Sequence, residues 1–394
     1  MATLSFKSKK NGYSLHNHAL LIQGGHNYFE HLLHLIRNAN TCIHFQTFIF
    51  EEDQTGIAVS KALIDAAGRG VRVMLLVDGY ASQQLSSNFI EKLQQAGVSF
   101  RFFEPLIRSK YFYFGRRLHH KVVVVDQMHA LVGGINVADK YNDFLGQAGW
   151  LDFAVYVQGN IVPILSELCW KTWNGFTTKI PPQLCPKHQL PPALLKQYDC
   201  QIRMRRNDWV LGKNEISTSY IQLFQSAQKN ITILCSYFLP GRFMRKHMQL
   251  AARRGVQITV IVAGTSDVQL SKHAERYLYD WMIRHGMKIY EYKKNVLHGK
   301  VAVADEMQMT IGSYNVNDIS AYASIELNLD IRHVPTATDL HNSLQKIIHE
   351  DCEQITETKH RKRTYWFMQL LRWASYELVR AMIYLTTFYF KKQV

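Results

Sequence analysis

The chain has 394 residues, 47% of them hydrophobic, which is enough to bury a large core and fits two domains or one duplicated domain. Its formal net charge of +15 predicts an acidic partner, such as anionic lipid, nucleic acid or another polyanion. The sequence has no run of about 18 uncharged apolar residues, which argues against an ordinary membrane span, and the N-terminus lacks the apolar stretch of a signal peptide.

The six cysteines are scattered along the chain without Cys-x-x-Cys spacing. We therefore expect reduced thiols in a protein that faces the cytosol, rather than disulfides or a zinc site. His44 alternates with apolar residues, which is typical of a core histidine. The histidines outside the motifs described below lack partners at metal-ligand spacing, so we predict no metal.

Strands and helices alternate through the first part of the chain, with glycines at the helix ends. Apolar runs predict strands and the 3.6-residue period predicts helices. The expected strands cover residues 41–50, 71–77 and 99–103, and the expected helices cover residues 57–67 and 88–95.

The same scheme returns in the second part of the chain. The expected strands there cover residues 231–235, 256–262 and 288–292, and the expected helices cover residues 242–253 and 273–284. Gly70 and Gly255 end corresponding helices, 185 positions apart. Repetition at so long a period indicates two duplicated domains rather than a solenoid.

A proline-rich stretch separates the two parts. Residues 180–192 hold five of the nine prolines, as expected of an extended connector. We therefore predict a first domain at 1–178, a linker at 179–199 and a second domain at 200–358.

One motif occurs in both parts, at residues 119–136 and 298–315. Each copy has His-x-Lys, an Asp five residues after the Lys, and Gly-Gly or Gly-Ser shortly before an Asn. The polar members are His119, Lys121, Asp126 and Asn136 in the first copy, and His298, Lys300, Asp305 and Asn315 in the second. A single His-x-Lys would carry no information, but two copies that agree at this many positions are a strong signal.

The motif has a simple geometric interpretation. Residues 122–125 are a run of valines, which predicts a strand buried on both faces. Side chains alternate along a strand, so His119 and Lys121 point to the same side and Asp126 to the other. Asp126 is therefore expected to bond the backbone near the strand end. The glycines leave room beside the amide donor of Asn136.

The pattern His-x-Lys-x4-Asp-x6-Gly-(Gly/Ser)-x-Asn in duplicate resembles the phospholipase D superfamily. The flanking stretches 46–50, 78–80, 237–241 and 297–300 make the chain most similar to the short bacterial cardiolipin synthases that lack N-terminal membrane spans. The resemblance covers nearly the whole chain. It implies an α/β fold with two phospholipase D-like α/β/α sandwich domains and an active site at their interface, and no cofactor.

Phosphodiester exchange without a metal needs a nucleophile, an acid for the leaving alkoxide and positive charge on the phosphate. Two imidazoles and two ammoniums in one pocket supply these, with asparagine amides as further donors. By resemblance to the family, His119 is expected to form a phosphohistidine and His298 to act as acid and base, although the near-symmetry of the repeats leaves this order open. The motif residues expected in the catalytic centre are His119, Lys121, Asp126, His298, Lys300 and Asp305, with Asn136 and Asn315 binding phosphate.

Each catalytic histidine also needs a group that fixes its tautomer. Family members place an acidic residue a few tens of positions after each motif histidine. The matching residues are Asp152 and Glu326. Their similar places in the two parts favour an orienting role over that of ordinary surface carboxylates.

Two segments combine cationic and aromatic residues. Residues 108–117 run into the first motif and could lie at a lipid interface, bind single-stranded nucleic acid, or pack inward. Residues 359–394 begin with a basic run and continue with an amphipathic helical pattern. This C-terminal segment is expected to lie in an anionic bilayer surface, with packing on the core as the alternative.

The expected reaction is cardiolipin synthesis, in which phosphatidylglycerol donates a phosphatidyl group to a hydroxyl of a second glycerophospholipid. The alternatives are a hydrolase or nuclease of the same superfamily and a non-catalytic binder of anionic lipid or nucleic acid. Intact His and Lys in both copies favour an enzyme, and two motifs in one chain favour lipid chemistry. The expected partners are anionic glycerophospholipids, with peripheral contact on the cytoplasmic side of the bacterial inner membrane and no obligatory nucleic acid or protein partner.

Overall fold

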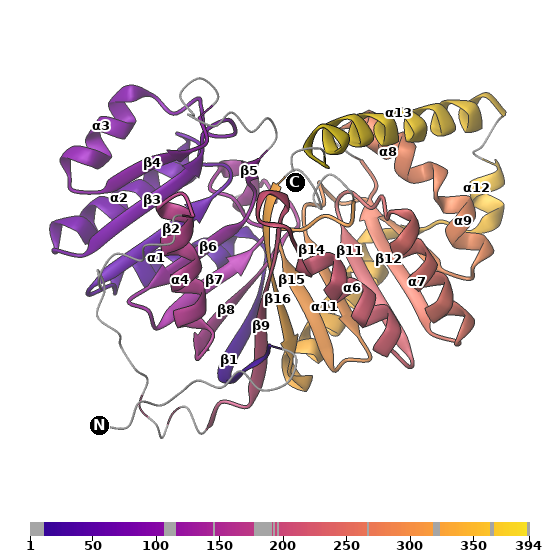
Figure 1. Cartoon of the computed structure of the whole chain (residues 1–394), viewed down its shortest axis with the longest axis horizontal. Coiled ribbons are helices and arrows are strands. Elements are labelled where there is room, and N and C mark those ends of the chain that lie inside the picture. Colours follow the sequence, from indigo (N-terminus) through magenta and orange to yellow (C-terminus); the bar gives the residue numbers. More distant parts are fainter. Residues whose placement is uncertain are drawn as a thin grey trace.

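The computed structural model of the chain describes residues 12–105, 116–144, 146–176, 191, 194, 197–265, 268–317, 324–362 and 366–391. Figure 1 shows two α/β halves that meet along a central group of strands, with helices on the outer faces. The first half is drawn in indigo to magenta, and the second runs from pink through orange to yellow.

The first half alternates strands and helices before it ends in the strands that carry the motif. Its strands are β1 (Ser14–Gln23), β2 (Cys42–Thr47), β3 (Arg72–Asp78), β4 (Ser99–Phe103), β5 (Arg117–Leu118), β6 (Lys121–Val125), β7 (His129–Gly133) and β8 (Phe153–Gly159). Its helices are α1 (Gly25–Arg37), α2 (Gln54–Gly68), α3 (Ser87–Gln95) and α4 (Val162–Trp173), with a short 3-10 turn at Asp139–Tyr141.

The second half repeats this order. Its strands are β9 (Cys200–Asp208), β10 (Lys213–Asn214), β11 (Asn230–Cys235), β12 (Gln257–Ala263), β13 (Lys288–Tyr292), β14 (Lys300–Ala304), β15 (Gln308–Gly312), β16 (Ser324–Arg332) and β17 (Cys352–Gln354). Its helices are α6 (Glu215–Ser226), α7 (Arg242–Arg253), α8 (Gln269–Tyr277), α9 (Tyr279–Arg284), α11 (Val334–Asp351), α12 (Glu357–Lys362) and α13 (Trp366–Lys391).

Most of the expected elements form close to their predicted bounds. The strands expected at 99–103 and 288–292 and the helix expected at 242–253 have those bounds in the structure. The helix expected at 273–284 instead forms two helices, α8 and α9, which meet at Leu278.

The strands of the two halves follow the same order. Read outward from the junction of the halves, the order is β1-β8-β7-β6-β2-β3-β4 in the first half and β9-β16-β15-β14-β11-β12-β13 in the second. The second half has one further strand, β17, beside β13. Within these two runs, β2, β3 and β4 are parallel to one another, as are β11, β12 and β13, and the other neighbouring pairs are antiparallel. Strand β1 pairs with β9, which joins the two halves.

A shared core lies between the halves. It contains side chains from β6, β7 and β8 together with side chains from β14, β15 and β16, among them Val122, Val155, Val303 and Leu327. Two further cores lie within the halves, one against α1, α2 and α3, and one against α6, α7, α8 and α9. The shared core keeps the two motif strands, β6 and β14, in one rigid unit.

The C-terminal helix α13 packs on the second half by one face. Arg372 and Ser375 are buried, Tyr376 stacks on Tyr277 of α8 at 5.0 Å between ring centroids, and Val379 packs against the core of the second half. The other face exposes large apolar side chains, namely Phe367, Leu370, Leu371, Trp373, Leu378 and Met382. Within the described residues, no helix combines the length and the apolarity needed to cross a bilayer.

The expectation that all six cysteines are reduced is wrong. Cys42, at the start of β2, is disulfide-bonded. Cys169, Cys200, Cys235 and Cys352 are free, as expected. The lack of Cys-x-x-Cys spacing does not exclude a disulfide, because the two cysteines need to be close in space and not in sequence.

Candidate active site

Each motif histidine is held by the backbone of the opposite half. The amide of His119 donates to the carbonyl of Ile325 at 3.1 Å, just after β5 pairs with the start of β16. The amides of His298 and Gly299 both donate to the carbonyl of Leu151, at 2.8 and 2.9 Å. Each histidine therefore lies beside the residue that precedes a predicted orienting carboxylate of the other half.

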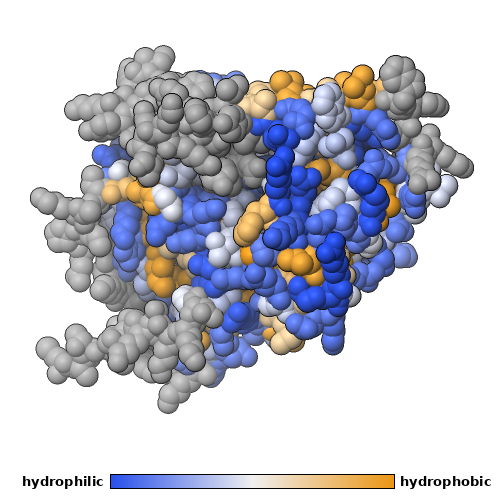
Figure 2. Space-filling model, turned by 45° about the vertical axis from the view of Figure 1, so that its right-hand side comes forward, coloured by the Kyte–Doolittle hydropathy of each residue, from blue (hydrophilic) through white to orange (hydrophobic). Residues whose placement is uncertain are grey.

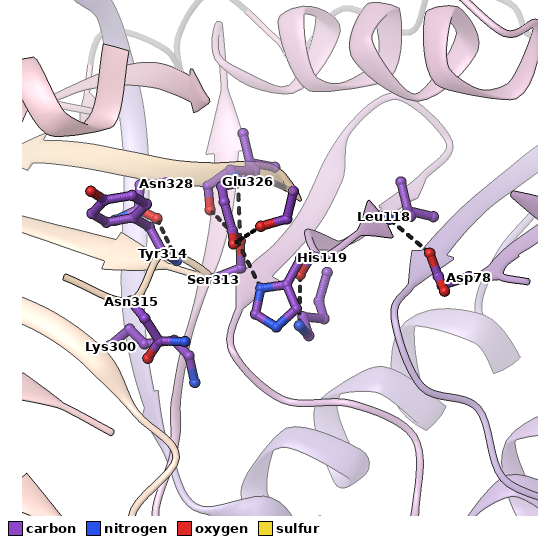
Figure 3. A network of polar contacts seen from close by, with 12 residues as sticks. Asp78, Leu118, His119, Lys300, Ser313, Tyr314, Asn315, Glu326 and Asn328 are labelled. Atoms are coloured by element: carbon purple, nitrogen blue, oxygen red, sulfur yellow. Dashed lines mark hydrogen bonds and ion pairs between the residues drawn. The ribbon is translucent and has the colours of Figure 1, made fainter. Parts of the chain in front are cut away.

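The carboxylates cross over between the halves. Nδ1 of His119 lies 2.9 Å from Oε2 of Glu326, and Nδ1 of His298 lies 2.6 Å from Oδ2 of Asp152 (Figure 3 shows the first pair). Both carboxylates are buried. A hydrogen bond at Nδ1 fixes the ring and leaves Nε2 of each histidine for the reaction.

The two carboxylates are supported in different ways. Glu326 accepts hydrogen bonds from the hydroxyls of Ser313 and Ser324 (Figure 3), the latter at 2.8 Å. Asp152 accepts from the amide of Phe153 at 2.7 Å. A Cβ on Gly134, which corresponds to Ser313, would lie 2.6 Å from Oδ2 of Asp152, so this position must stay glycine for the Asp152 carboxylate to fit.

The two lysines lie next to the histidines and are buried. Nζ of Lys121 donates to the carbonyl of His119 at 2.6 Å, and Nζ of Lys300 donates to the carbonyl of His298. Burial and the charge of Lys300 lower the pKa of Lys121 to about 7, although nearby carboxylates oppose this shift. Two buried ammonium groups that interact electrostatically provide a positive potential for one phosphate group.

The site lowers the pKa of both histidines in the absence of substrate. Burial lowers the pKa of His119, and Glu326 opposes this shift while Lys121 and Lys300 add to it. Burial and the charge of Lys300 lower the pKa of His298 to about 3, against the opposing effect of Asp152. A neutral imidazole can act as a nucleophile, and a bound phosphate anion would favour protonation of its partner.

The motif asparagines follow β7 and β15 and bond to the loops that follow β2 and β11. Oδ1 of Asn136 accepts from the amide of Ile49 at 3.0 Å, and Oδ1 of Asn315 accepts from the hydroxyl of Ser236 at 2.8 Å. The carbonyl oxygens are thus occupied. The amide nitrogen of Asn136 is buried and makes no hydrogen bond of normal geometry within the described residues, and the Tyr141 hydroxyl is a polar neighbour of this side chain.

The motif aspartates lie at the far ends of the motif strands. Asp126 accepts hydrogen bonds from the backbone amides of residues 40–42 at 2.8–3.0 Å, and Asp305 accepts from those of residues 228–230 at 2.7–2.9 Å. Both aspartates have positive φ, 53° and 54°, at the start of the hairpin turn that follows each strand. They fix the strand ends and do not contact the histidines, so the expectation that Asp126 and Asp305 belong to the catalytic centre is wrong. The backbone-bonding role predicted for Asp126 from the alternation of side chains is the one that the structure shows.

Aromatic residues that the motifs do not include line the site. Phe48 lies 4.8 Å from the His119 ring, with Nζ of Lys121 5.2 Å from the Phe48 ring centroid. Tyr141 lies 5.0 Å from the His298 ring, and its hydroxyl is 3.5 Å from Nε2. Trp150 lies 5.9 Å from the same ring.

Asp78 was also missed as a site residue, although the sequence pointed to the stretch that contains it. Its Oδ2 accepts from the amide of Leu118 at 2.8 Å (Figure 3), which fixes the residue before His119. No sequence signal connects Tyr141 or Trp150 with His298, because both lie more than a hundred residues before it. Among the described residues, no group of three or more His, Cys, Asp or Glu side chains is arranged to hold a metal ion.

The buried histidines predict loss of stability in mild acid. Burial lowers the pKa of His44, His120 and His298 to about 3 each, whereas the unfolded chain titrates near pH 6.5. The unfolded state therefore binds more protons between these values, and stability falls as the pH drops below about 6.5. Each histidine lowers the free energy of unfolding by up to about 1.4 kcal/mol for each pH unit of this decrease.

Urea unfolding at pH 7 and pH 5 would measure this effect, with a lower midpoint expected at pH 5. His44 can be replaced to test this explanation, because neither of its ring nitrogens has a hydrogen-bond partner in the described part of the chain and its replacement breaks no hydrogen bond there. The His44→Met variant should lose less stability between the two pH values than the parent. Equal midpoints at both pH values for the parent would contradict the prediction.

A search of protein-family models matches the chain in two segments. The model is described as cardiolipin synthase, PLD-like domain, and it matches residues 32–145 and 220–348. Each segment contains one copy of the His-x-Lys sequence. The two matches correspond to the two halves of the fold.

Several curated proteins are similar over most of their length. Cardiolipin synthase B of Salmonella typhi is 33% identical over 363 residues, which cover 91% of this chain and 86% of that protein. Cardiolipin synthase B of Escherichia coli K12 is 31% identical over 355 residues, which cover 89% and 85%. A cardiolipin synthase of Alkalihalophilus pseudofirmus is 27% identical, over 86% of this chain and 67% of that protein.

A solved structure shares the fold. The phosphatidylserine synthase of Haemophilus influenzae superposes with a TM-score of 0.72 at 14% sequence identity, covering 96% of this chain and 97% of that chain. At this identity the likeness concerns the fold alone. Together with the two matched segments, it confirms the predicted α/β fold with two phospholipase D-like halves.

Proposed function

The chain belongs to the family of cardiolipin synthases with phospholipase D-like domains, and from this membership we propose that it transfers a phosphatidyl group from phosphatidylglycerol to a hydroxyl of a second glycerophospholipid. It is a phosphatidyltransferase, as the sequence predicted. The observation that carries the detailed mechanism is the pair of buried histidines, each bonded through Nδ1 to a carboxylate of the other half.

In the first step, Nε2 of His119 attacks the phosphorus of phosphatidylglycerol. The bond between phosphorus and the glycerol headgroup oxygen breaks, and His298 donates its Nε2 proton to that oxygen, so that glycerol leaves. Lys121 and Lys300 neutralise the charge that develops on the phosphate oxygens, and Asn136 donates a further hydrogen bond. Glu326 stabilises the positive charge on His119 as the nitrogen–phosphorus bond forms.

In the second step, a hydroxyl of the second lipid takes the place of glycerol. His298 accepts the proton of this hydroxyl, and the oxygen attacks the phosphorus while the bond to Nε2 of His119 breaks. The product is cardiolipin when the second lipid is also phosphatidylglycerol. Asp152 holds His298 so that one nitrogen handles the proton in both steps.

This mechanism predicts a covalent intermediate on His119. Brief mixing with short-chain phosphatidylglycerol and an alkaline quench, in which phosphohistidine survives, should give a protein heavier by one phosphatidyl group. Peptide mass spectrometry should place the group on His119. A group found on His298 instead would reverse the assignment of the two histidines.

The remaining assignments concern the organisation of the chain and its location. We infer a first domain at 1–178, a linker at 179–199 and a second domain at 200–358, and a peripheral position on the cytoplasmic side of the bacterial inner membrane. The expected interfacial segment at 108–117 lies outside the described residues except for Arg116 and Arg117.

We propose that the C-terminal segment, residues 359–394, contributes to membrane contact. The sequence left open whether this helix packs on the core or lies in the bilayer. In the structure α13 uses one face for packing and exposes apolar side chains on the other, so the two roles are compatible. Deleting residues 359–394 should reduce co-sedimentation with anionic vesicles, and unchanged co-sedimentation would contradict this role.

A further inference from the structure

The two ends of the sheet can be distinguished by the residues that they carry. At one end, Ser236 follows β11 and bonds Asn315 of the site. At the other end, Asp305 binds the backbone amides that precede β11. The parallel strands of both halves thus have their carboxyl ends at the catalytic end of the molecule.

Exposed apolar side chains follow four of these strand ends. Ile57 and Tyr80 come after β2 and β3 in the first half, and Phe243 and Val268 come after β11 and β12 in the second. All four are exposed although they are large and apolar. We call these four residues the apolar rim. Both halves contribute to the apolar rim, and its residues follow strand ends at the catalytic end of the molecule.

The rim residues are connected to the walls of the site. The amide of Tyr80 donates to Oδ1 of Asp78 at 3.0 Å, and the other oxygen of the same carboxylate holds the residue before His119. Phe243 lies in the first turn of α7, at the end of the loop that begins with Ser236. The short connections mean that a surface contacting the rim also lies close to the pocket.

The rim in the second half is accompanied by positive charge. Helix α7 contains no acidic residue, and Arg242 and Lys246 are exposed beside Phe243. No carboxylate in the described ranges forms an ion pair with either side chain. Cationic groups with an exposed aromatic ring fit the headgroup region of an anionic bilayer.

Helix α13 extends this surface. The guanidinium of Arg245 on α7 donates to the hydroxyl of Tyr376 at 3.2 Å, which connects α7 with α13. Figure 1 shows α13 lying over α8, which itself begins just after Val268. Figure 2 shows hydrophobic patches along the upper edge of a mainly hydrophilic face, with further patches near its centre and left side.

We propose that the apolar rim, with Arg242 and Lys246, docks on an anionic lipid bilayer and holds the mouth of the catalytic pocket against the headgroups. This inference rests on the proposed function, since it assigns the surface from which the lipid substrates reach the site. It differs from contact through the C-terminal helix alone, because residues of both halves take part. Substrate phosphates at the headgroup level could then reach the lysines without leaving the bilayer.

The test compares two pairs of exposed apolar residues at opposite ends of the molecule. Tyr80 and Phe243 of the rim are 52% and 64% exposed, and Val334 and Met307 beside the Asp305 turn are 55% and 61% exposed. The Tyr80→Ser/Phe243→Ser double variant should bind vesicles of phosphatidylglycerol and phosphatidylcholine about tenfold more weakly than the parent. The Met307→Ser/Val334→Ser variant should bind as the parent does.

Activity is measured in parallel on phosphatidylglycerol in these vesicles and in detergent micelles. The rim variant should lose activity on vesicles and keep parental activity in micelles. Parental vesicle binding by the rim variant, or an equal loss in the control variant, would overturn the docking proposal. If the parent makes no cardiolipin in either form, the proposed function fails, while the binding comparison still decides the docking surface.

Charge is tested on the same helix. The Arg242→Gln/Lys246→Gln variant should bind phosphatidylglycerol vesicles less tightly than the parent and bind pure phosphatidylcholine vesicles equally. The matched control is Arg253→Gln, which removes an exposed cation at the opposite end of α7. The control removes one charge and the double variant removes two. If Arg253→Gln weakens binding half as much as Arg242→Gln/Lys246→Gln, the net charge of the protein, and not this surface, attracts the bilayer.

Discussion

Replacing either His119 or His298 by alanine is expected to lower kcat by about four orders of magnitude or more. The first replacement removes the nucleophile, and the second removes the group that protonates the leaving glycerol and deprotonates the incoming hydroxyl. Neither loss can be made up by the neighbouring histidine, because each ring is fixed to its own carboxylate. Cardiolipin formation from phosphatidylglycerol in detergent micelles measures the effect.

The control for this loss is the fold of the variants. Both should keep a thermal unfolding midpoint close to that of the parent, because the removed rings lie at the pocket and not in the shared core. Added imidazole should restore part of the activity if the missing ring is all that the variants lack. A variant that keeps more than about a tenth of the parental kcat would show that its histidine is not essential for phosphatidyl transfer.

Replacing the crossed carboxylates is expected to give the second largest effect. Asp152→Asn and Glu326→Gln keep the size of each side chain but replace the negative charge that stabilises the ring tautomer. Loss of the correct tautomer lowers kcat by about four orders of magnitude in a comparable histidine–carboxylate pair. KM should change much less, because neither carboxylate contacts the substrate in the proposed mechanism.

Nuclear magnetic resonance of the histidine ring nitrogens separates this role from a general loss of structure. Asp152→Asn should change the tautomer and the pKa of His298 and leave those of His119 nearly unchanged. Glu326→Gln should do the reverse. If each variant instead affected the histidine of its own half, the crossed arrangement would be wrong.

The sequence was sufficient for much of the fold because the signals involved are local. Periodicity and helix-ending glycines predicted β4, α7 and β13 at the bounds that the structure has. The duplicated motif identified the histidines, lysines and asparagines that the structure brings together. The alternation of side chains along a strand also predicted that Asp126 would bond backbone at the far strand end.

The features of the site that the sequence did not predict depend on contacts between residues far apart in the chain. Glu326 lies 207 positions from His119 and Asp152 lies 146 positions from His298, so the sequence identified both carboxylates without showing that they cross between the halves. The same reason applies to Tyr141 and Trp150, which reach His298 only through the packing of one half on the other.

The apolar rim was missed for a different reason. A single exposed apolar residue carries no signal in a sequence, because such residues are common on protein surfaces. Tyr80 and Phe243 can be recognised as parts of one surface only from the fold, in which both follow strands that end at the catalytic end of the molecule. The disulfide at Cys42 was likewise invisible in the spacing of the cysteines.

The most direct test of the central claim is mass spectrometry of the lipids that the purified protein makes from phosphatidylglycerol vesicles. The two-histidine transfer mechanism predicts cardiolipin and free glycerol in equal amounts, and neither product with His119→Ala or His298→Ala. Phosphatidic acid without cardiolipin would show that water, and not a lipid hydroxyl, accepts the phosphatidyl group, and would contradict the proposed transfer.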